Sequence, residues 1–172
     1  MIIISDTNIL SYFAACDSLP LLFRLFSRSE ICIPPAVQDE LQVGLKYGKT
    51  HLNIALKEIF ENRIQRLPLS SNDQEFSQNL PKNLKIGERE GIALARNRKL
   101  LFLSNDKQAV RYCHRYGILA NDLVDILRLL WTRRIISKHE VKVIINKMAE
   151  VEELTLSSKQ LAIIFARSRR RR

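Results

Sequence analysis

The chain has 172 residues, of which 46% are apolar, and its 28 basic residues outnumber its 18 acidic residues, which gives a formal net charge of +10. This length allows one domain with a substantial core, and the apolar content excludes a disordered chain. No apolar stretch approaches the length of a membrane span. The basic excess favours a polyanionic partner such as nucleic acid, because Lys and Arg that neutralise phosphates release counterions. The alternative is a basic surface that serves only solubility.

The cysteines and histidines restrict the chemistry of any metal site. Cys16, Cys32 and Cys113 are odd in number and widely spaced, so the chain has neither a disulfide framework nor a zinc spacing. We expect them to be reduced core residues of a cytoplasmic protein. The three histidines are also scattered, so a catalytic metal would be held by oxygen. The first residues lack the basic segment of a signal peptide.

The first quarter of the chain alternates between strand and helix patterns. Residues 2–5 form a continuous β-branched run that predicts a buried strand. Helices are predicted over 8–15 and 19–26, and a second strand over 30–33. Two prolines end this strand, and the second is suited to the first turn of a helix, where its missing N–H costs nothing. That helix is predicted to cover residues 35–45.

The middle of the chain contains one strand between helices. An amphipathic pattern predicts a helix over 51–62, and a third short strand follows over 64–67. Residues 69–86 are polar and contain a proline, so we expect only one or two helical turns, at about 73–80. This segment is expected to be the most mobile part of the chain. A further helix is predicted over 87–98.

The last part of the chain contains two predicted strands and four predicted helices. The strands, at 100–103 and 118–119, lie on either side of a helix at 107–116. Each of the last three helices follows a residue that can cap it. They are predicted at 123–132 after Asn121, at 139–151 after Ser137 and at 158–167 after Ser157.

This alternation predicts an α/β fold. We expect a three-layer α/β/α sandwich with a central parallel sheet of four to five strands, covered by helices on both faces. The α/β domain is expected to occupy residues 1–130. Residues 131–166 are expected to form a C-terminal helical extension of the same domain, and residues 167–172 a basic tail.

Four carboxylates lie at the ends of these elements. Asp6 and Asp106 follow the first and fourth predicted strands, which places both at the carboxyl edge of the sheet, where open α/β sheets bind ligands. Glu40 and Glu88 lie in the first turns of two helices. Glu40 can reach the same edge, whereas Glu88 does so only if the chain crosses back before it. Each acid alone can instead be explained as a helix cap or as a charge favoured by the helix dipole.

Four gathered carboxylates would require compensation. Two unit charges roughly 5 Å apart repel by about 3 kcal/mol at an effective dielectric of about 20, so either protons or a divalent cation must bind. An all-oxygen site suits Mg²⁺ or Mn²⁺, and such an ion can activate water and stabilise charge on a phosphate. The sequence therefore predicts a metal site of Asp6, Glu40, Glu88 and Asp106 that hydrolyses phosphodiester bonds.

Neighbouring acids receive other interpretations. Glu90 lies three residues after Gly87, so we interpret it as a capping residue that reaches back to a helix amide. Glu88 lies on the inward apolar stripe of its helix and is the better site candidate. Asp122 and Asp125 begin a late helix, where capping is the favoured interpretation, and the alternative for Asp122 is a place at the edge of the site.

Four short blocks resemble those of PIN-domain proteins, the family that includes the VapC-type toxin ribonucleases. The blocks are Ile-Ile-Ser-Asp-Thr-Asn-Ile-Leu around Asp6, Pro-Pro-Ala-Val-Gln-Asp-Glu-Leu around Glu40, Gly-Glu-Arg-Glu-Gly-Ile around Glu88 and Leu-Phe-Leu-Ser-Asn-Asp ending at Asp106. The third block is similar to a PIN subgroup written Gly-Glu-x-Glu-x-Ile, where many VapC toxins carry Asp. The intervals of 34, 48 and 18 residues match the family's compact layout, and the last interval favours Glu88 over Glu90.

The resemblance covers roughly residues 1–130 and carries functional expectations. It implies an acidic pocket that binds Mg²⁺ or Mn²⁺ through the four carboxylates, RNA cleavage by a metal-activated water, and commonly a homodimer. Asn8 and Ser104 would be second-sphere residues that orient water or a carboxylate. A toxin would also have an antitoxin protein as its partner. The Glu in the third block departs from the commonest VapC pattern, so the resemblance leaves membership of the toxin branch undecided.

Basic residues predict where a nucleic acid could lie. Lys107, Arg111 and Arg115 recur at every fourth position and form one exposed helix face that can hold RNA backbone without reading its sequence; the alternative is a solvated face. The tail 167–172 can bind nucleic acid non-specifically or bind an acidic partner. Further cations are expected near the mouth of the pocket, namely Lys46, Lys49, Arg89, Arg96 and Arg98.

The leading hypothesis is a metal-dependent endoribonuclease, with the toxin of a toxin–antitoxin pair as its specific form. The alternative is a catalytically silent PIN-like module that binds RNA or a protein. Two other α/β classes rank lower. A haloacid-dehalogenase phosphatase would require Asp where Asn8 stands, and a receiver domain would require its phosphoacceptor Asp after the third strand, where Pro68 follows.

Overall fold

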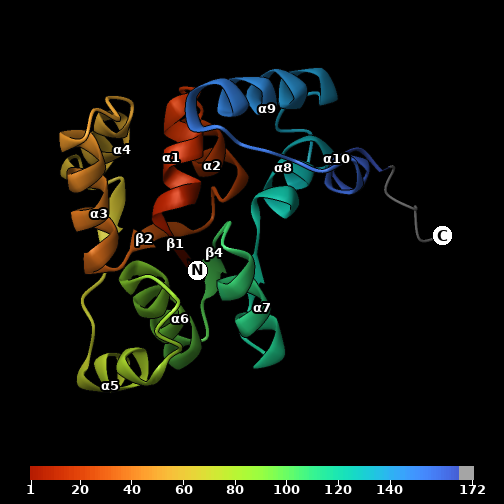
Figure 1. Cartoon of the computed structure of the whole chain (residues 1–172). Helices are drawn as coiled ribbons and strands as arrows, with labels where there is room; N and C mark the ends of the chain where they lie inside the picture. Colours follow the sequence, from red (N-terminus) through yellow and green to blue (C-terminus); the bar gives the residue numbers. More distant parts are fainter. Residues whose placement is uncertain (167–172) are drawn as a thin grey trace.

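The computed structural model describes residues 1–166 and contains a five-stranded parallel sheet between layers of helices (Figure 1). The strands lie in the order β3-β2-β1-β4-β5, and each pairs with its neighbours in parallel. This confirms the predicted α/β/α sandwich. The strand bounds are β1 Ile2–Ser5, β2 Glu30–Ile33, β3 Ile64–Arg66, β4 Leu101–Leu103 and β5 Ala120–Asn121.

The helices of the described residues lie close to the predicted ranges. The first six are α1 Thr7–Ala15, α2 Leu19–Leu25, α3 Pro35–Lys46, α4 Leu52–Phe60, α5 Ser71–Asn79 and α6 Ile86–Arg98. The last four are α7 Lys107–Arg115, α8 Leu123–Thr132, α9 Lys138–Glu152 and α10 Ser158–Phe165. Ser137 and Ser157 cap α9 and α10 as predicted, each within a capping box.

The predictions around β5 are wrong by one or two residues. The strand begins at Ala120, not Ile118, because the Ile118 amide is used to close the end of α7 through a 2.8 Å bond to the Cys113 carbonyl. Gly117 makes this turn with a φ of +68°, which favours glycine. The cap of α8 is Asp122, not Asn121, since the Asp122 carboxylate accepts the amide of Asp125 at 2.9 Å.

The segment expected to be most mobile contains a full helix that is anchored to its neighbour. Ser70 and Asp73 form a capping box at the start of α5. Asp73 is only 1% exposed and accepts hydrogen bonds from Arg98 at 2.7 Å and from Asn97 at 3.0 Å, both near the end of α6. Burial alone would raise the pKa of Asp73, but the bonds from Arg98 and the Ser70 amide lower that pKa to about 2. Helix α5 is therefore held by a carboxylate that must stay ionised.

Replacing Asp73 with Asn is expected to lower the free energy of unfolding by about 2 kcal/mol at pH 7, because it leaves the Arg98 charge without its partner. The matched control is Asp17→Asn, which removes an exposed pair with Lys147 and is expected to cost less than about 0.5 kcal/mol. Urea unfolding measures both. Since the folded pKa of Asp73 is depressed, its contribution should be present above pH 4 and disappear as the pH falls towards about 2. Equal costs for the two variants would contradict this anchoring role.

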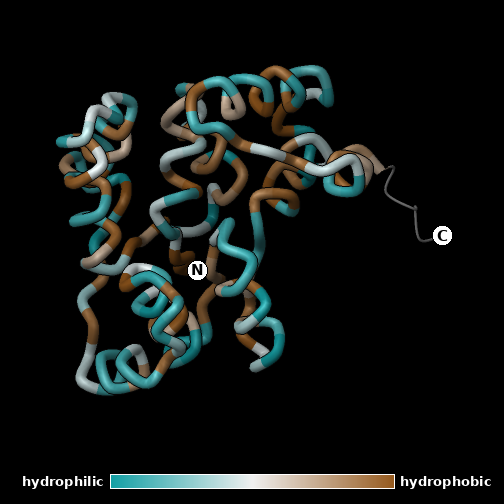
Figure 2. Tube along the Cα trace, viewed as in Figure 1, coloured by the Kyte–Doolittle hydropathy of each residue, from teal (hydrophilic) through white to brown (hydrophobic). Residues whose placement is uncertain are grey.

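Each face of the sheet has its own apolar core. Ile3, Ile31 and Leu103 point to the face covered by α1, α2, α8 and α9, whereas Ile4 and Phe102 point to the face covered by α6 and α7. The strand residues alternate between the faces, as the pleat of a strand requires. In Figure 2 the strands in the middle of the view are largely hydrophobic and much of α5 is hydrophilic.

Helix α6 packs unusually close to the sheet at Gly91. A Cβ atom there would lie 2.5 Å from the ring of Phe102, so glycine is needed for this approach. The close packing brings the start of α6 to the carboxyl edge of β1 and β4.

The C-terminal helices pack onto the same side of the domain as α1. Figure 1 shows α9 lying across the end of α1 and α10 beside α8. The indole N–H of Trp131 donates to the Ile164 carbonyl at 2.6 Å, and the Lys138 ammonium donates to the Phe165 carbonyl at 3.0 Å. These bonds satisfy carbonyls at the end of α10. The predicted basic tail lies outside the described residues. Across residues 1–166, no helix combines the length and the apolar character needed to cross a membrane.

Candidate functional site

Asp6 lies at the carboxyl end of the central strand β1 and is 2% exposed. It caps α1, because its Oδ1 accepts the Ile9 amide at 2.8 Å. Burial raises the pKa of Asp6 to about 7 despite this bond, and the nearby charge of Glu88 adds to the rise. The strand order reverses between β1 and β4, so Asp6 stands at the switch point where α/β sheets bind ligands.

Ser104 connects Asp6 to Asp106. Its hydroxyl donates to Asp6 Oδ2 at 2.6 Å and accepts the Asp106 amide at 3.1 Å, and the side chain is fully buried. Asp106 caps α7 by accepting the amides of Gln108 and Ala109 at 2.8 and 2.7 Å. The two acids that follow neighbouring strands therefore share one hydroxyl group, as the predicted orienting role of Ser104 requires.

Glu40 approaches the cluster from α3. Its carboxylate accepts a hydrogen bond from the Thr7 hydroxyl on α1 and one from the Gly87 amide at 3.2 Å. A Cβ atom at position 87 would lie 2.8 Å from Glu40 Oε1, so glycine at this position allows the two helices to meet. Thr7 and Gly87 are site residues that the sequence did not single out, although both lie beside acids in the four blocks.

Glu88 completes the cluster from the start of α6 and is 5% exposed. Burial raises the pKa of Glu88, and the charges of Asp106 and Glu40 raise it further. Because Glu88 also acts on Asp6, its carboxylate is electrostatically coupled to all three other acids. The crossing that Glu88 required is therefore present, since α5 and the loop after it return the chain to the carboxyl edge.

The interpretation of Glu90 as a cap of its own helix is wrong. Helix α6 begins at Ile86, so Glu88 is its third residue and accepts the Lys85 amide at 2.9 Å in the capping geometry. Glu90 instead accepts the Ala36 amide at 2.9 Å and so caps the start of α3. Glu88, and not Glu90, therefore caps α6, because the helix begins at Ile86, one residue before the predicted start at Gly87.

The donor set fits an oxygen-binding divalent cation. The four carboxylates supply only oxygen, which Mg²⁺ and Mn²⁺ prefer. Burial, and after it the neighbouring carboxylates, raise the pKa values of Asp6 and Glu88, and a cation would offset both effects. Across residues 1–166, no three His, Cys, Asp or Glu side chains are arranged as a ready-made metal site. Helix amides and hydroxyls hold at least one oxygen of each of the four acids.

Comparison with known families identifies the family of the chain. A family model described as DUF3368, a PIN domain, matches residues 2–169 and so includes the C-terminal helices. The chain belongs to the PIN-domain family. No curated protein matches the chain significantly.

A solved structure of Rickettsia felis VapBC2, bound to a DNA fragment from the promoter, has a chain with the same fold. The identity is 19% and the TM-score 0.53, and the match covers 71% of this PIN domain and 98% of that chain. At this identity the likeness supports the fold.

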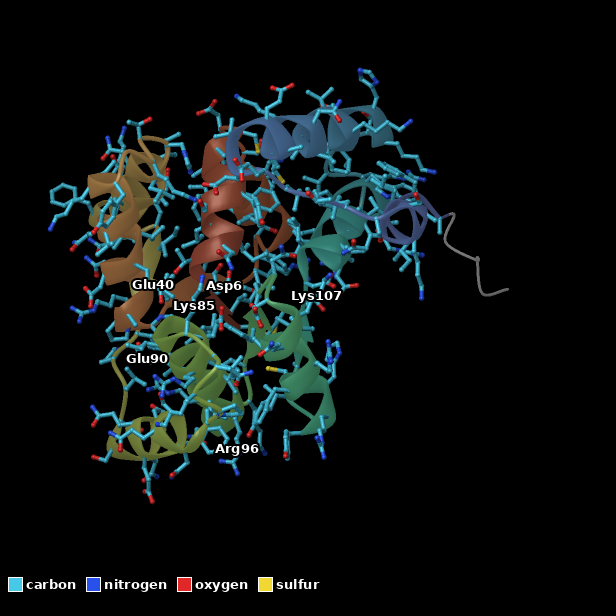
Figure 3. All side chains as sticks on the ribbon, in the orientation of Figure 1. Asp6, Glu40, Lys85, Glu90, Arg96 and Lys107 are labelled. Carbon is cyan, nitrogen blue, oxygen red and sulfur yellow. The ribbon has the colours of Figure 1, made fainter. Side chains whose placement is uncertain are left out.

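A groove of about 760 Å³ opens beside Glu40 in this PIN domain. Asn8 and Lys85 line it, together with apolar side chains of α3, α4 and α6. Asn8 thus lies beside Glu40 in the groove wall, and its second-sphere role stays a prediction. Figure 3 shows Glu40, Lys85 and Asp6 gathered between α1, α3 and α6. Burial raises the pKa of Glu88, and the exposed Lys85 ammonium beside it opposes part of that rise. Its position three residues before Glu88 is a signal that the sequence analysis did not use.

Most of the cations expected at the mouth of the pocket serve the fold. Arg98 binds Asp73, and the Arg96 guanidinium lies 4.2 Å from the Phe76 ring centroid. Lys49 pairs with Glu152 of α9 at 2.7 Å. These three side chains contact other helices and so contribute to the packing of the fold.

Glu152 ties the end of α9 to the rim of the groove. It accepts a hydrogen bond from Ser11 at 2.5 Å and lies 2.5 Å from His51 Nε2. Burial opposes its ionisation, but the bonds from Lys49 and Ser11 hold the pKa of Glu152 below its usual range. Ser11 lies one helical turn after Thr7 on α1. The C-terminal extension therefore contacts the side of α1 on which Thr7 binds Glu40.

The basic stripe of α7 has the predicted exposure. Lys107, Arg111 and Arg115 are all exposed along a helix that starts at Asp106. In Figure 3, Lys107 lies on the opposite side of Asp6 from Glu40. In this view Lys85 and Lys107 thus lie on opposite sides of Asp6.

Proposed function

We propose that this PIN domain is an endoribonuclease that depends on Mg²⁺ or Mn²⁺ and hydrolyses RNA phosphodiester bonds. The observation that carries the proposal is the gathering of Asp6, Glu40, Glu88 and Asp106 at one edge of the sheet. Buried carboxylates of this kind are costly without a cation. The net charge of +10 on the rest of the chain suits a polyanionic substrate.

The residues around the acids have distinct tasks in this proposal. Asp6, Glu40, Glu88 and Asp106 would hold the cation, which would supply an activated water and stabilise charge on the phosphate. Ser104 fixes the orientation of Asp6, and Thr7 fixes that of Glu40. Asn8, on the groove wall, orients water. Lys85 and Lys107 bind phosphate oxygens on the two sides of the cluster.

We propose further that the chain is the toxin of a toxin–antitoxin pair and acts as a homodimer. The VapBC2 structure from Rickettsia felis, which contains a chain of the same fold, supports a protein partner for this family of folds. Inducing the wild-type chain should arrest growth of a bacterial host, whereas a variant with a defective site should not.

Light scattering on the purified chain tests the proposed homodimer, because it measures the mass of the oligomer.

Incubation of the purified protein with end-labelled single-stranded RNA tests the enzymatic proposal. Cleavage is expected in Mn²⁺ or Mg²⁺ and should stop in EDTA, because the carboxylates need the cation to act on a phosphate. Titration calorimetry should detect Mn²⁺ binding without RNA. Equal cleavage in EDTA and Mn²⁺ would contradict the proposal and indicate a contaminant or a metal-free reaction.

A catalytically silent module is the second candidate. It is favoured by one observation, that the described side chains do not form a ready-made metal site. This candidate predicts RNA or protein binding with no cleavage in any divalent cation. The same incubation therefore separates the two functions.

A further inference from the structure

Helix α7 carries two stripes of side chains that lead away from Asp106. Lys107, Arg111 and Arg115 recur every fourth residue and so follow one side of the helix. Tyr112 and Tyr116 each follow an arginine and form a second stripe beside the first. At about 1.5 Å rise per residue, the stripes extend about 13 Å from the candidate site.

The two tyrosines form a pair with one open ring. Their ring centroids are 4.5 Å apart and the planes are inclined by 35°. Tyr112 is half-buried, whereas Tyr116 exposes 58% of its surface. The Arg115 guanidinium lies 5.8 Å from the Tyr116 ring centroid, near the outer limit of about 6 Å for a cation–π contact. Tyr116 is thus supported by Tyr112, and a cation stands beside it.

This combination suits unpaired nucleotides better than a duplex. Proteins that bind single strands combine cations along the backbone with aromatic rings on which bases stack. The bases of a duplex are stacked inside it, and double-stranded RNA is recognised through its backbone and 2′-hydroxyl groups. An exposed tyrosine ring therefore adds affinity only for a base that is free to stack on it.

We propose that α7 is a binding track for unpaired RNA nucleotides, in which Tyr116 stacks on a base. Lys107, Arg111 and Arg115 bind the backbone that leads from this base to Asp106. The inference rests on the proposed RNA-cleaving function, because it places the substrate on the helix that Asp106 caps.

Fluorescence anisotropy with a labelled 12-nucleotide RNA in EDTA tests binding separately from cleavage. Tyr116→Ala is expected to weaken single-strand binding about tenfold, since stacking on one base is worth roughly 1–3 kcal/mol and about 1.4 kcal/mol is tenfold. Tyr116→Phe, which keeps the ring, should bind like the wild type. The matched control is Tyr47→Ala, which removes a tyrosine that is 85% exposed just after α3.

The same RNA annealed to its complement separates stacking from charge. Tyr116→Ala should change duplex affinity less than twofold, whereas Arg115→Gln should weaken both RNAs. The stacking role would be overturned if Tyr116→Ala weakened duplex and single-strand binding equally. It would also be overturned if Tyr116→Ala bound the single strand as tightly as the control Tyr47→Ala. If the wild type cleaves RNA but Tyr116→Ala binds normally, only this inference fails. If Tyr116→Ala loses binding but the wild type never cleaves, only the proposed nuclease function fails.

Discussion

Replacing Asp6 with Asn is expected to reduce metal-dependent RNA cleavage at least about 100-fold, which corresponds to about 2.7 kcal/mol of activation free energy. Asp6 stands at the centre of the site, since it shares Ser104 with Asp106 and is coupled to Glu88. Asn removes the charge that a cation requires. Asn also caps helices about as well as Asp, so α1 should keep its cap and the fold should survive.

The matched control is Asp122→Asn. Asp122 also follows a strand and caps a helix, and its charge acts on the neighbouring Asp125. The Asp122→Asn variant should therefore cleave RNA at the wild-type rate in Mn²⁺. Gel analysis of cleavage and circular dichroism of both variants make the measurement. Full cleavage by Asp6→Asn would refute the assignment of the site, and loss of cleavage in Asp122→Asn would extend the site to β5.

The stability of the metal-free protein is expected to decline between pH 4 and pH 7 because of Asp6. Its pKa is raised from 3.8 to about 7 in the folded state, so the folded protein keeps a proton that the unfolded chain releases. The stabilising contribution is therefore complete below about pH 4 and is lost as the pH rises through about 7. A shift of this size is worth about 4 kcal/mol.

A difference curve isolates the effect of Asp6 from the other titrating groups. Asp6→Asn cannot titrate, so its free energy of unfolding should gain about 4 kcal/mol relative to the wild type between pH 4 and pH 7. Urea unfolding in EDTA, at half-unit steps of pH, measures both proteins. Parallel curves would show that Asp6 is not buried as a protonated acid. Saturating Mn²⁺ should stabilise the wild type more than Asp6→Asn at pH 7, because only the wild type keeps all four carboxylates for the cation.

Most secondary structure, and the places of Asp6, Glu40 and Asp106 at the ends of elements, could be predicted from local patterns. Apolar runs mark the strands and prolines or capping residues mark the helix starts, and these signals act over a few neighbouring residues. Asp6 and Asp106 directly follow such runs, and Glu40 follows the helix start at Pro35. Their arrival at one edge follows from the parallel order of the strands.

The capping of α6 by Glu88 and of α3 by Glu90 could not be predicted in this way. Both lie in one turn of α6, and the choice depends on where the helix begins and on which neighbour each side chain meets. Glu90 meets the Ala36 amide, which is 54 residues away in the chain. The same limit applies to Arg98, whose expected position at the pocket is replaced by its bond to Asp73.

The sequence by itself determined the α/β class, the order of the elements and the positions of the four candidate carboxylates at element ends, because hydrophobic period and capping chemistry are local properties. Only the tertiary structure decided which carboxylates share Ser104, which cations stay free beside them and where α6 begins. These outcomes depend on contacts between residues far apart in the chain, and such contacts form only when both cores of the sheet are packed.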